Sequence, residues 1–467
     1  MSFKRKLQFY KFRFLRPMKN GRFWRHFAFL FCVAVLLRLL LALPALAEPA
    51  TLLRPDSMGY WSPATALAAG DGYVTAPGSN IPELIRPCGY PWFLALTIKL
   101  FGSSFLPAAL AGILLGASGV LPITLALRKF TGDRPALLGG WLYALNMTAI
   151  AVSPLILADN LLGIIAAWQL FMTIYLIRER QMVYFAGLTL LAIAGCFVKP
   201  VNLPVVLVGL PVILLATAHG WKSLVAGMVT LIFFVSLLLV PIWYENYKLC
   251  GGFDGNTANI YFHNGSAISA HATGESSEVW KKRLLARADA AFRKNPAKYQ
   301  SLKAQNEWKK AQFIKLIKQY PVSAAITHLP NVFNLLPDLP TMLENNHITR
   351  GERGTMAVLR QQGFIAAVQH YLGDKWGWIF ILLPLLAVHL LTLLLAAVRL
   401  TFYLFKRQWR YLLIFGVLVF YYIWAPGPVI SPRYLLPALP MLIAMATQMT
   451  LKMDFTTEDN NIERITL

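Results

Sequence analysis

The sequence predicts an all-α, multi-pass membrane protein, a helical bundle of about ten spans. Three observations lead to this fold class. Hydrophobic residues make up 57% of the 467 residues and charged residues only 14%, a balance too apolar for a soluble enzyme of this length. Apolar runs of about 20 residues, long enough to cross a bilayer, recur along the chain. Lysine and arginine cluster in alternate loops between these runs, as the positive-inside rule requires.

The predicted spans follow one another with short connections, including tight turns near Ser153 and Lys199. The first run ends in a sequence that resembles a signal-peptidase site, but its length favours a retained span. The apolar runs lie at 27–47, 105–127, 135–153, 160–177, 183–198, 202–218, 222–243, 376–398, 410–425 and 434–450. Ten spans place both termini in the cytoplasm, together with the basic clusters near 1–26, 128–134, 178–180 and 399–410.

Three parts follow from this topology. Residues 1–243 form an N-terminal membrane module with a basic cytoplasmic tail and an exterior loop at 48–104, in which two short amphipathic helices lie at the membrane interface. Residues 244–375 form a small, mainly helical exterior (periplasmic) domain with a basic face. Residues 376–467 form a C-terminal membrane module with a short cytoplasmic tail. We expect the protein in the plasma (inner) membrane.

The net charge of +23 does not indicate nucleic-acid binding. The positive-inside bias and attraction to anionic head groups account for much of it, and no nucleic-acid module is visible. The four cysteines show no metal spacing and no CxxC motif. Cys88 and Cys250 both fall on the exterior side, so the sequence leaves open whether they form a disulfide or remain unpaired.

Four charged residues fall at the exterior ends of predicted spans. Asp56 follows the first span and is a plausible general base for an incoming hydroxyl, or a simple helix-end acid. Asp159 starts the fourth span in apolar surroundings, where acids are functional candidates, although a helix dipole would also favour it. Lys199 and Arg433 stand beside prolines, where they bind an anionic head group or act as interface anchors.

The exterior loop adds aromatic and basic residues near Asp56. Tyr60, Tyr73, Arg86 and Tyr90 are predicted to contact a sugar or an acceptor, on a loop stiffened by prolines and glycine. The exterior histidines match no metal motif, and no Walker loop, GxSxG or HExxH is present. We therefore expect no metal site from the motifs, while a divalent metal cofactor stays open.

Taken together, four segments resemble the integral-membrane GT-C glycosyltransferases, the superfamily of protein O-mannosyltransferases and lipid A aminoarabinose transferases. They occur in the family's order, on one predicted membrane face. They are Asp56 to Tyr73 with "RPCGYPWFLAL", then "SPLILADNLLG", then "WYENYKLCGGFDGNTANIYFHNGS", and finally "SPRYLLPALPMLI".

The resemblance implies transfer of a sugar from a polyprenyl-phosphate donor to a lipid, glycan or protein acceptor at the exterior membrane face, with inversion at the anomeric carbon. It implies that Asp56 is the catalytic acid/base residue and Asp159 a supporting acid. Lys199 and Arg433 would hold the donor phosphate.

The chain departs from the family's pattern at two positions. Ser57 stands where many members carry a second acid, and Cys88 replaces a usual proline, which puts metal dependence and acceptor identity in question. The alternatives are a transporter or flippase for a lipid-linked or anionic substrate, whose internal repeats we do not find, and a ligase that joins whole lipid-linked glycans.

Overall fold

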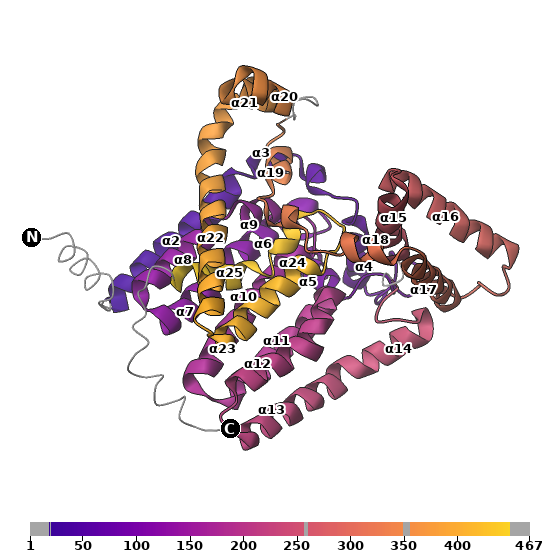
Figure 1. Cartoon of the computed structure of the whole chain (residues 1–467), viewed down its shortest axis with the longest axis horizontal. Helices are drawn as coiled ribbons and strands as arrows, with labels where there is room; N and C mark the ends of the chain where they lie inside the picture. Colours follow the sequence, from indigo (N-terminus) through magenta and orange to yellow (C-terminus); the bar gives the residue numbers. More distant parts are fainter. Residues whose placement is uncertain (1–17, 19, 256–259, 349–354, 449–467) are drawn as a thin grey trace, which may run out of the picture.

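The computed structural model describes residues 18, 20–255, 260–348 and 355–448 (Figure 1). In these ranges the chain is helical and forms no β-strand, apart from one isolated bridge between Val74 and Pro82. The prediction of an all-α fold is confirmed. Most of the basic N-terminal segment, the end of the predicted 434–450 span and the C-terminal tail lie outside the described residues.

The helices follow one another along the chain with short connections. They are α2 (Asn20–Leu40), α3 (Leu43–Ala47), η1 (Pro49–Leu52), α4 (Met58–Ala69), α5 (Gly89–Phe101), α6 (Phe105–Ser118), α7 (Val120–Thr131), α8 (Asp133–Ala144), α9 (Met147–Val152), α10 (Asp159–Glu179), α11 (Met182–Val198), η2 (Pro200–Asn202), η3 (Val205–Gly209), α12 (Leu210–Thr217), α13 (Trp221–Phe234), η4 (Val235–Leu239), α14 (Val240–Cys250), α15 (Ile260–Thr273), α16 (Ser277–Lys294), α17 (Leu302–Gln319), α18 (Pro321–Thr327), η6 (Val332–Leu335), α19 (Leu339–Asn345), α20 (Thr355–Gln362), α21 (Phe364–Leu372), η7 (Gly373–Trp378), α22 (Ile379–Phe405), α23 (Trp409–Tyr411), η8 (Leu412–Gly416), α24 (Val417–Trp424), η9 (Pro432–Leu435) and α25 (Leu439–Gln448).

Many of these helices are apolar enough to lie in a bilayer, so the chain is a multi-pass membrane protein. Within the described ranges, six helical stretches are long and apolar enough to cross: Asn20–Leu40, Phe105–Thr131, Asp159–Glu179, Pro200–Thr217, Trp221–Cys250 and Phe364–Phe405. Three shorter apolar helices, Met182–Val198, Trp409–Trp424 and Leu439–Gln448, coincide with further predicted spans. The count of ten crossings remains a prediction.

The predicted span 135–153 is not one helix. It consists of α8 and α9, separated at Leu145 and Asn146. Asn146 has extended backbone angles, and its side chain accepts a hydrogen bond from the N–H of Ala149. A side chain that satisfies a free N–H in this way is a helix N-cap, so the second helix starts afresh and the chain turns toward α10.

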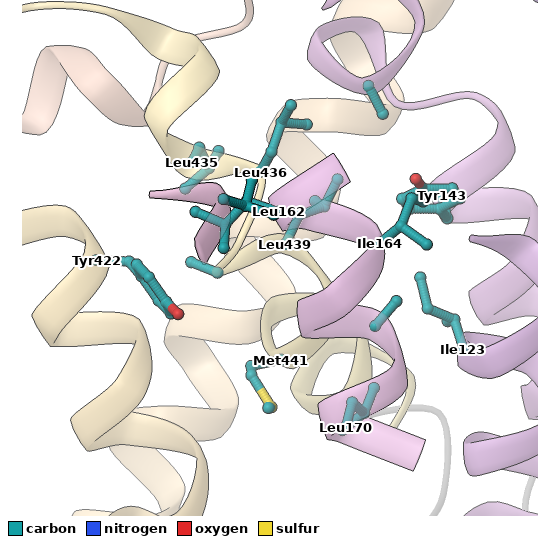
Figure 2. Packing of buried hydrophobic residues seen from close by; sticks show 14 of the residues in the cluster. Ile123, Tyr143, Leu162, Ile164, Leu170, Tyr422, Leu435, Leu436, Leu439 and Met441 are labelled. Atoms are coloured by element: carbon teal, nitrogen blue, oxygen red, sulfur yellow. The ribbon is translucent and has the colours of Figure 1, made fainter. Parts of the chain in front are cut away.

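Helix α10 lies inside the bundle and connects its two ends. It packs against α6, α7, α11 and α25, and its inward residues include Leu162, Ile164 and Leu170 (Figure 2). A helix of 21 residues spans roughly 30 Å, close to the thickness of the bilayer core. Asp159 begins this helix and Glu179 ends it, so the two residues lie at opposite ends of the bundle.

Helices α15 to α18 gather to one side of the bundle (Figure 1) and have a small core of Tyr261, Leu284 and Leu316. The chain then returns to the bundle through η6 and α19. There the side-chain amide of Asn345 donates to the carbonyl of Ala151 at 2.8 Å. This return path places α19 against α9.

The four cysteines are all described, and all are free thiols. The disulfide between Cys88 and Cys250 that the sequence left open is therefore not formed. Cys196 and Cys250 are buried, Cys88 is half-buried, and Cys32 is exposed on the surface of α2.

Candidate functional site

Asp56 lies in a tight turn between η1 and α4. The hydroxyl of Ser57 accepts the N–H of Arg54 at 2.8 Å, and the N–H of Ser57 donates to the Arg54 carbonyl at the same distance. Ser57 is fully buried, whereas the Asp56 side chain is 43% exposed. The turn therefore leaves the Asp56 carboxylate accessible to solvent, and the hydroxyl of Ser57 holds the turn.

Arg86 forms the closest ion pair with Asp56. Its Nη2 donates to Oδ1 of Asp56 at 2.8 Å, and its guanidinium lies 4.8 Å from the ring centroid of Tyr60. Gly59 makes room for it, because a Cβ at Gly59 would lie 3.0 Å from Nε of Arg86. Stacking on a tyrosine and pairing with a carboxylate together fix the plane of the guanidinium.

The backbone of Arg86 is held by its own loop. Its N–H donates to Oε1 of Glu83 at 3.0 Å, and its carbonyl accepts the hydroxyl of Tyr73 at 2.6 Å. Tyr73 thus acts on the loop that carries Arg86. Burial comes first among the causes that raise the pKa of the Tyr73 hydroxyl, followed by the charge of Glu83, so the hydroxyl remains a hydrogen-bond donor.

Lys199 and Asp159 form a second, more deeply buried pair. Lys199 follows the last residue of α11, and its Nζ lies 2.6 Å from Oδ1 of Asp159 at the start of α10. The Asp159 side chain is only 4% exposed. A buried carboxylate needs a partner of this kind, since removal from water penalises an isolated charge heavily.

Arg433 joins the two pairs into one network. Its Nη2 lies 3.4 Å from Oδ2 of Asp56, and its Nε lies 3.8 Å from Oδ2 of Asp159. The second distance is too long for a hydrogen bond, and this buried Nε has no hydrogen-bond partner among the described residues. The ring of Tyr434 lies 5.5 Å from the guanidinium and 5.0 Å from Nζ of Lys199.

The chain after Arg433 is anchored to α10 by packing. Leu436 lies beside α10, near Leu162 (Figure 2), and α25, which begins at Leu439, packs against α10. Gly163 allows the close approach, because a Cβ there would lie 3.3 Å from Cβ of Leu436. The same contact therefore sets the distance between Arg433 and Asp159.

The network holds its groups in their charged forms. Partial burial would raise the pKa of the Asp56 carboxyl, but the hydrogen bond from Arg86 and the charges of Arg86, Arg433 and Lys199 outweigh it and hold that pKa below its usual value. Burial would lower the pKa of the Arg433 guanidinium, but Asp159 above all raises it. At neutral pH the site therefore contains three cations and two carboxylates, which leaves one positive charge in excess.

The residues in this site do not form a metal centre. In the described part of the chain, no three His, Cys, Asp or Glu side chains gather closely enough to hold a metal ion. The two carboxylates of the site are each held by cations, and Ser57, which follows Asp56, is buried. This donor set does not fit a divalent cation.

The structure brings all four predicted charged residues together, although Asp56 and Arg433 are 377 positions apart. Of the predicted sugar or acceptor contacts, Arg86 pairs with Asp56. Tyr60 and Tyr90 are 4% and 3% exposed and pack edge to face at 5.3 Å. Sugar contact by Tyr60, Tyr73, Arg86 and Tyr90 remains a prediction. Tyr434 was not among the site residues predicted from the sequence, although it directly follows Arg433.

Residues 85–244, roughly one third of the chain, match the family model described as dolichyl-phosphate-mannose-protein mannosyltransferase. This segment is similar to a family of membrane glycosyltransferases. The match contains Arg86, Asp159 and Lys199 and supports the resemblance to the GT-C superfamily that the motifs indicated. No curated protein matches the chain.

One solved structure shows a likeness over most of the chain. It is the crystal structure of ArnT from Cupriavidus metallidurans bound to undecaprenyl phosphate, at 16% sequence identity, with 89% of this chain and 77% of that chain covered and a TM-score of 0.38. A likeness of this size carries no argument about the activity of this chain.

Proposed function

We propose that this protein is a membrane glycosyltransferase that moves a sugar from a polyprenyl-phosphate donor to a hydroxyl of a lipid, glycan or protein acceptor. The observation that carries the proposal is the network of Asp56, Arg86, Arg433, Asp159 and Lys199 at one end of the bundle. It combines an exposed carboxylate with a cluster of cations, as this transfer requires. The family match over residues 85–244 supports the same reaction class.

The excess positive charge suits the donor. A sugar linked to a polyprenyl phosphate carries one negative charge on its phosphodiester, which would neutralise the network. Arg433 is the best placed phosphate ligand, since its buried Nε has no hydrogen-bond partner among the described residues and a guanidinium binds phosphate in bidentate fashion. Lys199 would supply a second point charge.

Asp56 would act as the general base. Its carboxylate, held in the ionised form by Arg86, would accept the proton of the acceptor hydroxyl as the oxygen attacks the anomeric carbon. The bond from that carbon to the phosphate oxygen breaks, and its electron pair leaves with the polyprenyl phosphate. The additional negative charge on the leaving group would be stabilised by Arg433 and Lys199. Direct displacement inverts the anomeric carbon.

The charges at the two ends of α10 support an assignment of the membrane side. At the end opposite to Asp159, Lys129 pairs with Glu179, and Arg178 donates to the carbonyl of Phe130 at 3.1 Å. Basic residues favour the cytoplasmic side. We therefore place the site on the periplasmic or exterior face of the plasma (inner) membrane and both termini in the cytoplasm. Residues 244–375 would form the exterior domain, between membrane modules 1–243 and 376–467.

The test compares membranes with and without the protein for consumption of lipid-linked sugars, measured by mass spectrometry of the lipid extract. An Asp56→Asn variant that inserts normally should abolish consumption, because an amide cannot accept the proton. Full transfer by that variant would refute the catalytic assignment. Movement of the donor across the bilayer without its cleavage would favour the transporter alternative.

A further inference from the structure

Arg433 stands on a segment that cannot hold itself in place by regular backbone bonding. The loop between α24 and η9 contains Pro426 and Pro428, and η9 begins at Pro432; none of the three prolines has an N–H donor. The N–H of Val429 donates to the carbonyl of Pro426 at 3.2 Å, and the carbonyl of Ser431 accepts the N–H of Tyr434 at 3.0 Å. The carbonyl of Val429 and the N–H of Ser431 therefore need partners from elsewhere.

Asn334 in η6 supplies both partners. Its Oδ1 accepts the N–H of Ser431 at 2.6 Å, and its Nδ2 donates to the carbonyl of Val429 at 3.1 Å. Asn334 is 2% exposed, so these bonds are shielded from competing water. One side chain thus fixes two backbone positions of the loop, Val429 and Ser431. Ser431 lies two residues before Arg433.

Asn334 is itself held by the bundle. The adjacent carbonyl of Leu335 lies 2.9 Å from Nε2 of His389 on α22, and Nδ1 of the same ring lies 3.0 Å from Nδ2 of Asn146. Three residues further on, the N–H of Asp338 donates to the hydroxyl of Thr148 at 3.1 Å. The segment 334–338 is therefore braced on both α22 and α9.

We propose that Asn334 is a positioning residue for Arg433: by holding the chain before Arg433, it keeps the guanidinium between Asp56 and Asp159. The inference rests on the proposed function, because Arg433 is assigned there to the donor phosphate. The close approach of Leu436 to Gly163 on α10 fixes the chain after Arg433, and Asn334 fixes the chain before it. Loss of either support would let the guanidinium move away from the phosphate.

The test is a double-mutant cycle on the purified, full-length protein in lipid nanodiscs. Asn334→Ala should lower kcat/KM for the lipid-linked donor by about tenfold or more, since small misplacements of binding groups are costly. The KM for the acceptor should stay unchanged. In the Arg433→Ala background, Asn334→Ala should have little further effect, because the two residues act as one unit.

Two variants serve as matched controls. Asn331→Ala removes the side chain that caps the same short helix through the N–H of Phe333, a hydrogen bond that does not involve the loop. Ser431→Ala keeps the N–H that Asn334 accepts. Both should retain the donor kcat/KM of the wild type. Asn334→Asp keeps the shape and the oxygen that accepts from Ser431, so it tests the proposal with an intermediate loss if the alanine variant does not fold.

The outcomes are distinguishable. A fully additive loss from Asn334→Ala and Arg433→Ala would overturn the positioning role, and so would an equal loss from Asn331→Ala. Absence of transfer by the wild-type protein would overturn the proposed function instead. In that case, binding of polyprenyl phosphate alone still decides the positioning role: it is supported if Asn334→Ala and Arg433→Ala weaken binding non-additively and refuted if Asn334→Ala leaves it unchanged.

Discussion

Gly89 lies directly against the backbone of Phe197: a Cβ at Gly89 would lie 2.7 Å from the Phe197 carbonyl oxygen. Gly89 starts α5 immediately after the turn that carries Arg86, and Phe197 stands two residues before Lys199. The close approach therefore holds the turn that carries Arg86 next to the segment that carries Lys199. The glycine of the "RPCGYP" run is needed for this contact.

We expect Gly89→Ala to destabilise the protein by about 1–3 kcal/mol, the usual cost of forcing extra atoms into a packed region, and to lower transfer activity. The measurement is the unfolding midpoint in detergent together with donor turnover. Gly377→Ala is the control, because nothing lies within 4 Å of the Cβ that it adds. Equal behaviour of the two variants would contradict the importance of the contact.

Removal of Lys199 should destabilise the fold because it leaves Asp159 buried without its closest partner. We expect Lys199→Met to cost about 3–5 kcal/mol, and Lys199→Met with Asp159→Asn to cost less than the sum of the two single changes. Chemical unfolding measures both. Lys129→Met breaks the pair with Glu179, whose two side chains are 39% and 32% exposed, and should change the free energy of unfolding much less, because exposed ion pairs contribute little. A smaller effect at Lys199 than at Lys129 would refute the prediction.

Replacement of Arg433 should affect the donor more than the acceptor. Arg433→Ala removes the guanidinium and should raise the donor KM by about tenfold or more, since charge-assisted contacts to phosphate are strong. Arg433→Lys keeps the charge but loses the planar fork, so we expect only partial recovery. Steady-state kinetics with each substrate varied in turn measures the effect. A larger change in the acceptor KM would count against a phosphate role.

The pH dependence of transfer should respond to Arg86. The folded-state pKa of Asp56 lies below its ordinary value of 3.8. The stability from its ion pairs is therefore fully present above that value and is lost as the pH falls through the folded pKa. Arg86→Gln removes the main group that lowers this pKa, so the acidic limb of kcat/KM should move to higher pH.

A suitable control for Arg86 is Arg283→Gln, which breaks an exposed ion pair between α16 and Glu275, just before this helix. It should leave the pH profile of kcat/KM in place. An acidic limb that does not move in Arg86→Gln would show that Asp56 is not the titrating base.

Much of the membrane architecture and the charged core of the site could be predicted from the sequence. Apolar runs identify spans because their length must match the bilayer, and acids beside such runs are costly enough to be informative. The break at Asn146 was missed, because an N-cap inside an apolar run interrupts a helix without changing its hydropathy. The residues "ALNMTA" contained that signal.

Other features depend on tertiary contacts that no local pattern encodes. The ion pair of Arg86 with Asp56, which lies 30 positions away, is one of them. The packing of Tyr60 on Tyr90 is another, and the predicted sugar or acceptor contacts of these residues stay predictions. Asn334 stands in a segment rich in Asn, Leu and Pro, where only the position of the 429–431 backbone reveals what its amide does.

The free cysteines provide a natural chemical label for sidedness. Cys196 and Cys250 are buried and Cys32 lies midway along an apolar helix, so a membrane-impermeant maleimide has Cys88 as its target. Burial raises the pKa of the Cys88 thiol, which makes its alkylation slow at neutral pH and faster in mildly alkaline buffer. Intact cells or spheroplasts treated in this way should label the unmodified protein. The membrane face that contains Asp56 can therefore be identified without an engineered residue.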